Sequence, residues 1–347
     1  MLKVKKYGII LRPTKYEFEK TAVLNPAVYK EGNHVNIFYR AINSKNESTI
    51  GCAKLNGPLR VVERWKKPFM DMEYEYEKKG VEDPRIVKLG KTFYMTYVAH
   101  DGKNAITAYA TSKDLKTFKK QGVISPKISY HKAEKLFKQS HLKDAYYFFS
   151  SYYQDQAGKD VLLWEKDIFL FPKKFNGKYA LMHRILPDIQ LVYFKSFKEL
   201  NNDFWTKEIR HLSKDVILEG SHWYETRNIG GGCPPIETKD GWVVIFHSVE
   251  EVNLGRVYHA SAALLDKKDP RKVIARLHEP LFSPQEKWER QGFVNNVVFP
   301  TGTALFGKKL YIYYGAADKY IAAASVDIDD LIYTMKTNLH HHTYENR

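Results

Sequence analysis

The sequence predicts an all-β fold built from repeated units, and three observations support this prediction. Aromatic residues make up 14% of the 347 residues, and aromatic side chains favour strands. One pattern recurs five times: a glycine at a turn precedes a strand-like run that ends in polar or aromatic residues. A second strand-like run follows most copies. Several short strands per unit, separated by glycine turns, are typical of a β-propeller, so five copies predict a five-bladed β-propeller.

The five copies follow one another at roughly regular spacing, at residues 32–40, 90–97, 177–184, 241–247 and 307–314. The second runs are clearest at residues 105–111, 189–194, 260–265 and 320–325. We expect the five glycine-led runs to be the inner strands of the blades. Their polar ends would then converge on one funnel at the propeller axis, where a ligand could bind.

The longest interval between copies contains an insertion around residues 126–160. Within it, residues 130–138 predict a short amphipathic helix, and residues 145–153, which are rich in tyrosine and phenylalanine, predict a strand. We expect residues 1–336 to form a single five-bladed propeller domain. Residues 337–347 contain three consecutive histidines and are expected to be a flexible C-terminal tail, because chain termini are often poorly ordered.

Composition narrows the classes of partner. The formal net charge is +15, but the lysines are scattered in pairs, whereas a nucleic-acid surface would concentrate them on one element. We therefore expect no nucleic-acid partner, although the positive potential would attract small anions such as phosphate. No signal-peptide-like run and no stretch of about 20 apolar residues is present, so no membrane contact is expected. Two distant cysteines imply no disulfide framework, which favours the cytoplasm; the sequence is compatible with a homo-oligomer.

Residues 80–85, Gly-Val-Glu-Asp-Pro-Arg, place two acids and a guanidinium beside a proline. Such a cluster can hold one carboxyl group at a shifted pKa next to a fixed cation, which is what an acid catalyst needs. The alternative is a solvated turn in which Arg85 pairs with Glu82. A position just before a predicted inner strand favours the functional interpretation.

The propeller geometry would gather polar residues from distant parts of the chain in the funnel. They are Arg40, Asp83, Arg85, His100, Asp101, Arg184, Asp188, His247 and Asp318. A convergent ring of acids, arginines and aromatics is typical of a sugar or anion site.

Other chemistries find no support. The chain has no dinucleotide or Walker-type glycine loop and no His-x-x-x-His spacing for a metal, so no cofactor and no metal are predicted. Cys233 has no local partner that would activate a thiolate. Residues 230–235, Gly-Gly-Gly-Cys-Pro-Pro, predict a rigid turn that lets the backbone approach a ligand closely.

A set of motifs spread over nearly the whole chain resembles glycoside hydrolase family 130 in kind and order. The motifs lie at residues 25–27, 39–41, 80–85, 177–179, 183–184, 231–236, 247, 296–300 and 314–318. The resemblance implies a five-bladed β-propeller that acts on β-mannosides with inversion. Most members of the family are phosphorylases that release mannose 1-phosphate, and some are hydrolases.

The same resemblance implies roles for individual residues. Asp83 would be the general acid, with its proton reaching the glycosidic oxygen through a sugar hydroxyl. The substrate, a mannose-containing oligosaccharide, would be held by Arg40, Glu82, Arg85, Asp101 and Asp318. A phosphorylase would use inorganic phosphate as co-substrate and needs a cluster of cations, whereas a hydrolase needs a carboxylate base.

The residues expected to hold the attacking phosphate or water differ from those of the family's phosphorylases. Lys166 and Asp167 stand where an Arg-Asn pair is expected, and Asn228 stands where a lysine is expected, while Arg184 and His247 match. A carboxylate in a phosphate pocket lowers affinity by like-charge repulsion. This favours hydrolysis over phosphorolysis. The base would then be Glu225 first, followed by Asp167, Glu250 or Glu251.

Three alternatives to hydrolysis follow from the same residues. The first is phosphorolysis of β-mannosides, if Lys166 and Arg227, the residue next to Asn228, together form a pocket of positive charge. The second is a non-catalytic propeller whose acids only hydrogen-bond sugar hydroxyls. The third is a scaffold that binds an anionic protein or nucleic acid through the positive charge.

Overall fold

The structure is a computed structural model that describes residues 2–253 and 255–342. Within these residues the strands form four sheets. The largest sheet consists of two antiparallel groups of four strands, joined by one parallel pairing between Ser48 and Gly80. The first group is β2 (Ala22–Glu31), β3 (His34–Ile42), β4 (Ser48–Asn56) and β5 (Arg60–Arg64), and the second is β6 (Gly80–Leu89), β7 (Thr92–His100), β8 (Ala105–Ser112) and β9 (Lys119–Val123).

The other three sheets are also antiparallel and follow in chain order. The third group is β10 (Phe169–Leu170), β11 (Tyr179–His183), β12 (Ile189–Phe194) and β13 (Val216–Leu218). The fourth is β14 (Asn228–Gly231), β16 (Trp242–Val252), β17 (Gly255–Leu265) and β18 (Val273–Arg276), with β15 (Ile236–Glu237) beside β16. The fifth is β19 (Val298–Phe306), β20 (Lys309–Ala316) and β21 (Tyr320–Asp327), completed by β1 (Lys5–Leu11) from the other end of the chain.

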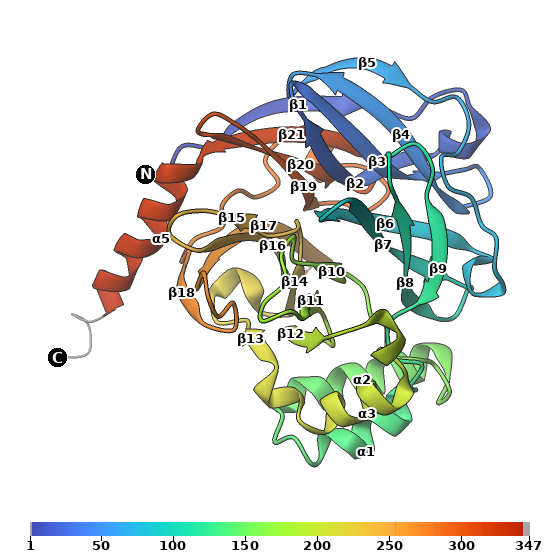
Figure 1. Cartoon of the computed structure of the whole chain (residues 1–347), viewed down its shortest axis with the longest axis vertical. Coiled ribbons are helices and arrows are strands. Elements are labelled where there is room, and N and C mark those ends of the chain that lie inside the picture. Colours follow the sequence, from blue (N-terminus) through green and yellow to red (C-terminus); the bar gives the residue numbers. More distant parts are fainter. Residues whose placement is uncertain (1, 254, 343–347) are drawn as a thin grey trace.

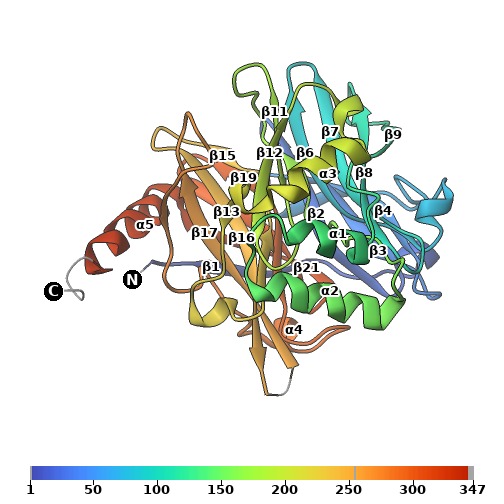
Figure 2. The same cartoon turned by 90° about the horizontal axis from the view of Figure 1, so that it is seen from below.

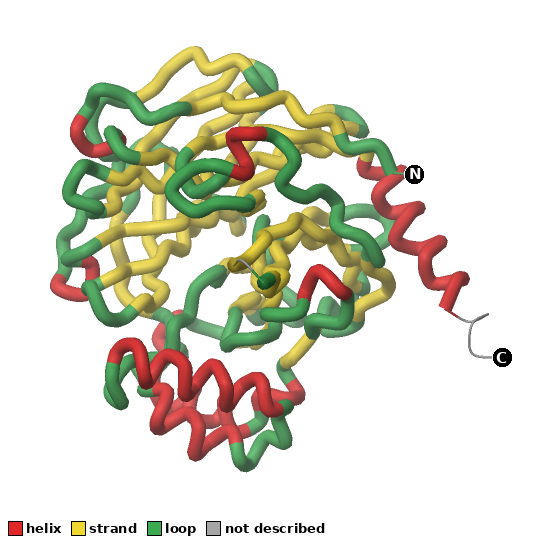
Figure 3. Tube along the Cα trace, turned by 180° about the vertical axis from the view of Figure 1, so that it is seen from behind, coloured by secondary structure: helices red, strands yellow, loops and turns green. Residues whose placement is uncertain are grey.

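The five groups lie one after another around a common centre, as Figures 1 and 3 show. The first strand of each group, namely β2, β6, β10, β14 and β19, lies nearest this centre (Figure 1). The prediction that the five glycine-led runs are the innermost strands was therefore wrong. Those runs form the second strands, β3, β7, β11, β16 and β20, and the strands that precede them in the chain are innermost.

Buried side chains from facing sheets form the core. Phe169 and Met182 of the third group, for example, belong to the same buried cluster as Trp242 and Phe246 of the fourth. These strands have buried residues on both faces, which matches their nearly continuous apolar runs.

Helices are few and short. They are α1 (Tyr130–Phe137), α2 (Asp144–Ala157), α3 (Asn202–Arg210), α4 (Lys287–Arg290) and α5 (Ile328–His342), with single 3-10 turns at Glu17–Glu19, Glu75–Glu77, Phe197–Glu199, Leu212–Lys214 and Trp223–Glu225. Helices α1, α2 and α3 lie together beside the third group (Figures 1 and 2). Among the described residues, no helix is long and apolar enough to cross a membrane.

The insertion confirms one sequence prediction and corrects another. Residues 130–138 were expected to be helical, and α1 occupies this stretch. Residues 145–153 were expected to be a strand but belong to α2, where Tyr146, Phe149 and Ser150 are buried at helical spacing. Helical periodicity therefore outweighs the β preference of the aromatic residues. At the other end, α5 includes Thr337 to His342 of the expected tail, and residues 343–347 lie outside the described residues.

Candidate active site

A cavity of about 410 Å³ lies where the five groups meet. Eight of the predicted site residues line it: Arg40, Asp83, Lys166, Asp167, Arg184, Asn228, His247 and Asp318. They come from β3, β6, the segment before β10, the residue after β11, β14, β16 and the turn between β20 and β21. The remaining lining residues are Asn25, Phe149, Tyr152, Tyr153, Gln156, Ala157, Trp164, Leu186, Arg227, Val249, Arg256, Tyr258, Val297 and Phe299.

An unusual backbone conformation orients four of the side chains that line the cavity. Asn25, Asp83, Asp167 and Asp318 all have positive φ, between 47° and 61°. For residues with a Cβ this conformation is strained, and such strain is concentrated at functional sites. Asparagine and aspartate tolerate it best, which explains the residue types found here. In β6 the strand register shifts between Glu82 and Arg85, so the strand bulges at Asp83.

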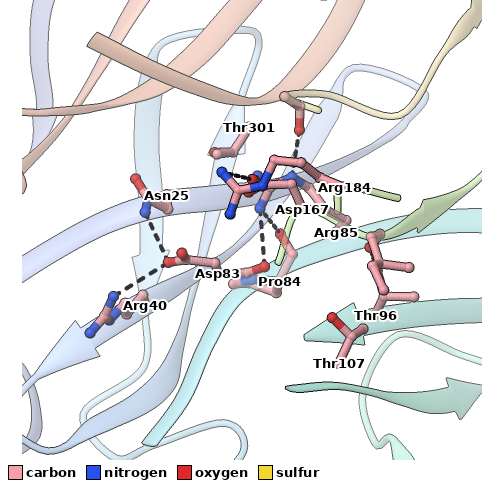
Figure 4. A network of polar contacts seen from close by, with 12 residues as sticks. Asn25, Arg40, Asp83, Pro84, Arg85, Thr96, Thr107, Asp167, Arg184 and Thr301 are labelled. Carbon is pink, nitrogen blue, oxygen red and sulfur yellow. Dashed lines mark hydrogen bonds and ion pairs between the residues drawn. The ribbon is translucent and has the colours of Figure 1, made fainter. Parts of the chain in front are cut away.

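One side of the cavity, the acidic side, holds Asp83, Asp318 and Glu82 around Arg40. Asn25 donates a hydrogen bond from Nδ2 to Asp83 Oδ1 at 2.8 Å, and Arg40 Nη1 lies 3.8 Å from the same oxygen (Figure 4). Arg40 Nη2 also donates to Glu82 Oε1 at 2.7 Å. Glu82 thus fixes the guanidinium of Arg40 and does not itself line the cavity.

Two carboxyl groups on this side have shifted pKa values. Burial raises the pKa of Asp318 to about 6; Arg40 opposes this shift and the Asp83 charge reinforces it. Burial also disfavours the charged form of Glu82, but Arg40 and Lys166 outweigh it, so the pKa of Glu82 is lowered. Near pH 6, Asp318 is therefore a hydrogen-bond donor and acceptor next to Asp83.

Arg85 lies beneath the cavity and does not line it. Its guanidinium is 1% exposed and donates to the backbone carbonyls of Gly232, Asp83 and Pro84. Its Nη2 is 3.7 Å from Asp167 Oδ1. Arg85 therefore holds the turn that carries Asp83, and the structure places it behind that turn rather than among the groups that face the cavity.

Another part of the lining, the cationic side, holds Arg184, Lys166, Arg227, Arg256 and the imidazole of His247, and Lys166 also lies near enough to the acidic side for its charge to lower the pKa of Glu82. Burial lowers the pKa of His247 to about 4, so this ring is neutral at ordinary pH. Arg184 Nε and His247 Nδ1 are buried and have no hydrogen-bond partner among the described residues. Buried polar atoms are rarely left unpaired, so these atoms are suited to a ligand.

Asp167 lies on this side, but its charge is compensated. Its Oδ2 is 3.2 Å from Arg184 Nη1, and its Oδ1 faces Arg85 (Figure 4). Burial would raise the pKa of Asp167, yet the charges of Arg184 and Arg85 outweigh it and lower the pKa. The carboxylate thus stays ionised between two guanidinium groups.

The glycines at positions 230 and 231 leave room for the side chains of this part of the site. A Cβ at Gly230 would lie 2.4 Å from His247 Cε1 and 2.9 Å from Asp167 Oδ2, and one at Gly231 would lie 2.6 Å from Phe169 Cε1. The predicted close approach to the backbone is therefore made, in this structure, by side chains of the same chain. Cys233 is buried, which raises the pKa of its thiol and keeps it unreactive.

Comparison with known proteins identifies the family of this chain. Residues 7–337 match the model of a family described as beta-1,4-mannooligosaccharide phosphorylase, glycoside hydrolase family 130. The chain belongs to glycoside hydrolase family 130. It is therefore an enzyme of this family, as the sequence motifs predicted.

Relatives within family 130 cover the chain almost completely. A 1,2-beta-oligomannan phosphorylase of Thermoanaerobacter sp. (strain X514) is 31% identical over 95% of this chain and 99% of its own length. A beta-1,2-mannobiose phosphorylase of the same organism is 35% identical over 92% of this chain and 94% of its own length. The solved beta-1,2-mannobiose phosphorylase of Listeria innocua, in complex with beta-1,2-mannobiose, has a TM-score of 0.73 at 21% identity and covers 97% of this chain and 100% of that one.

Several residues predicted for the family 130 site lie outside the cavity lining. Glu225 accepts hydrogen bonds from Arg276 and from the backbone N–H groups of Ser221 and His222, and burial raises its pKa. Asp101 accepts from the backbone of Lys103 and Asn104 in its own turn. The remaining acids are also paired: Asp188 with Lys143, Glu250 with His259 and Glu251 with Arg227.

Sequence reasoning missed one wall of the cavity. Phe149, Tyr152, Tyr153 and Gln156 of α2 line it, together with Arg256 and Tyr258 of β17. The guanidinium of Arg227 lies over the rings of Phe149 and Tyr152, at 5.3 and 5.4 Å. The aromatic residues of the insertion could have indicated this wall, but residues 145–153 were interpreted as a strand and not as a helix. Asn25 was noticed only as part of a motif, although it precedes a proline just as Asp83 does.

Proposed function

We propose that this family 130 enzyme cleaves β-1,2-linked mannosides by phosphorolysis with inversion and releases mannose 1-phosphate. The relatives at 31% and 35% identity are named as phosphorylases of β-1,2-mannosides, which supports the phosphorolysis alternative over the hydrolysis favoured by the sequence departures. We take the five groups of strands as the blades of a five-bladed β-propeller. The likeness of the whole chain to a solved family structure supports this arrangement.

The observation that carries the proposal is the charge pattern of the cavity. Among the described lining residues, five cationic side chains face three carboxylates, and two of these carboxylates lie on the acidic side with Arg40. The third, Asp167, was expected to repel phosphate. Its pairing with Arg184 and Arg85 reduces that repulsion, and the buried Arg184 Nε has no hydrogen-bond partner among the described residues.

The two sides suggest a division of labour. On the acidic side, Asp83 supplies the proton to the leaving oxygen, while Arg40 and Asp318 bind the mannose at the cleaved bond. On the cationic side, Arg184, His247 and Lys166 hold inorganic phosphate, with Arg227 and Asn228 nearby. Attack from the face opposite the leaving group inverts the anomeric centre.

Hydrolysis would need a carboxylate base on the cationic side. Asp167 is the carboxylate in that position, and its lowered pKa makes it a weak proton acceptor. Glu225, the base ranked first from the sequence, is bound to Arg276 away from the cavity lining. Neither residue fits the role well, which leaves phosphorolysis as the better reading.

The test incubates the purified protein with β-1,2-mannobiose and, separately, β-1,4-mannobiose, each with and without inorganic phosphate. We expect α-mannose 1-phosphate and mannose from β-1,2-mannobiose only when phosphate is present, with the anomer assigned by proton NMR. Free mannose at equal rates with and without phosphate would overturn the proposal in favour of hydrolysis. Faster cleavage of the β-1,4 substrate would overturn the linkage.

A further inference from the structure

The segment before β10 carries two residues of the cationic side and is not itself in a strand. Lys166 and Asp167 line the cavity, and Asp167 has a left-handed backbone with φ of 61°. A non-helical, strained segment needs bonds from its surroundings to hold one conformation. The question is which groups supply them.

A buried acid and histidine pair lies directly behind this segment. Glu165 and His183 are both fully buried, and Glu165 Oε1 lies 3.0 Å from His183 Nδ1. The other oxygen, Glu165 Oε2, accepts a hydrogen bond from the backbone N–H of Arg184 at 3.4 Å. One carboxylate therefore ties the segment of Lys166 and Asp167 to the end of β11, where Arg184 leaves the strand.

Two buried threonines anchor the same segment at its ends. Thr107 Oγ1 donates to the carbonyl of Glu165 at 2.6 Å, and Thr96 Oγ1 donates to the carbonyl of Ile168 at 2.5 Å. Figure 4 shows both threonines on the strands beside Asp167. Side chains from the second group thus fix a segment of the third.

We propose that Glu165 and His183 are positioning residues for phosphate, an inference that rests on the proposed phosphorolysis. Together they set the distance between Arg184 on one side and Lys166 and Asp167 on the other. A buried ionisable pair is poor evidence of stability, because desolvation offsets most of its attraction, so its value lies in specifying geometry. The ring of Trp205, 5.1 Å from that of His183, closes the pair off from solvent.

The test substitutes Glu165→Gln and, separately, Thr107→Val. A glutamine amide can accept from the Arg184 N–H only by turning its NH2 group toward His183 Nδ1, which forces His183 to carry its proton on Nε2, a buried atom without a hydrogen-bond partner among the described residues. The matched control is Glu19→Gln, because Glu19 is equally buried and is paired with Arg64 at 2.6 Å but lies outside the cavity lining. We expect Glu165→Gln to raise KM for phosphate about tenfold and to change KM for β-1,2-mannobiose less than threefold.

The outcomes separate this inference from the proposed function. If the wild-type protein releases no mannose 1-phosphate, the proposed function fails. If it does, but Glu165→Gln and Glu19→Gln alter KM for phosphate equally, the positioning role is refuted. Should Glu165→Gln fail to fold, Thr107→Val decides: an unchanged KM for phosphate would refute the role, and a selective rise would support it.

Discussion

Gly230→Ala probes the cationic side without removing any functional group. The new Cβ would lie 2.4 Å from His247 Cε1, whereas ordinary contacts begin at 3.4 Å, so the ring must move by about 1 Å. His247 cannot move freely, because the ring of Phe299 lies 4.3 Å away, centroid to centroid. A displacement of about 1 Å at a positioned group costs on the order of a hundredfold in rate. Overpacking of this kind destabilises a protein by about 1–3 kcal/mol.

We therefore expect Gly230→Ala to lower kcat/KM for phosphate about a hundredfold. Initial rates of mannose 1-phosphate release at varied phosphate, and urea unfolding followed by fluorescence, measure the two effects. Gly220→Ala is the control, because its Cβ would lie 2.9 Å from the Glu225 carbonyl, outside the cavity lining. If both variants lose the same activity, or if Gly230→Ala keeps full phosphate affinity, the assignment of His247 to phosphate is wrong.

Three further predictions address single carboxyl groups. Asp83→Asn should reduce kcat by about 10²- to 10⁴-fold with KM for mannobiose nearly unchanged, and steady-state kinetics that show a loss below tenfold would exclude Asp83 as the acid. Asp318 binds a proton more tightly in the folded state, so its contribution to stability is lost as pH rises from about 4 to about 6. Relative to wild type, Asp318→Asn should gain up to about 3 kcal/mol of unfolding free energy over that range, and parallel denaturation curves at both pH values would contradict this. Glu225→Gln removes the charge that pairs with Arg276 but keeps an oxygen that can accept its hydrogen bond, so it should cost less than the roughly 3–5 kcal/mol of breaking a buried ion pair, while kcat stays within threefold; a larger fall in kcat at unchanged KM would restore Glu225 as a base.

Much of the fold follows from local patterns in the sequence. Each glycine-led run became a strand because alternating apolar residues after a turn form a sheet strand with few alternatives. Which strand lies innermost was not predictable in this way. Strands β2 and β6 contain Asn25-Pro26 and Asp83-Pro84, and prolines usually argue against a central strand. Here each proline lies beside a bulge, where the missing N–H leaves no ladder bond unmade.

The site could be predicted where residue type and backbone conformation coincide. Asp83, at a strand bulge, and Asp318, in a turn, both combine an acidic side chain with positive φ, and both line the cavity. Glu225 shows where such a prediction fails. Its partner Arg276 lies on β18, far along the chain, and no residue near Glu225 in the sequence indicates that pairing. Pairings over such separations depend on the packing of whole sheets, which one sequence does not specify locally.

The pairing of β1 with β21 has a consequence for how the protein is made. Asp83 emerges early in synthesis, whereas Asp318 lies in the turn just before β21, and the last sheet also needs β1 from the start of the chain. Closing so long a stretch of chain is entropically costly and slow, and contacts between distant segments fold late. A growing chain can therefore form its first sheets long before it can bind a sugar. If the proposed function is right, mannoside binding should therefore report that β1 and β21 have paired and the last sheet is complete.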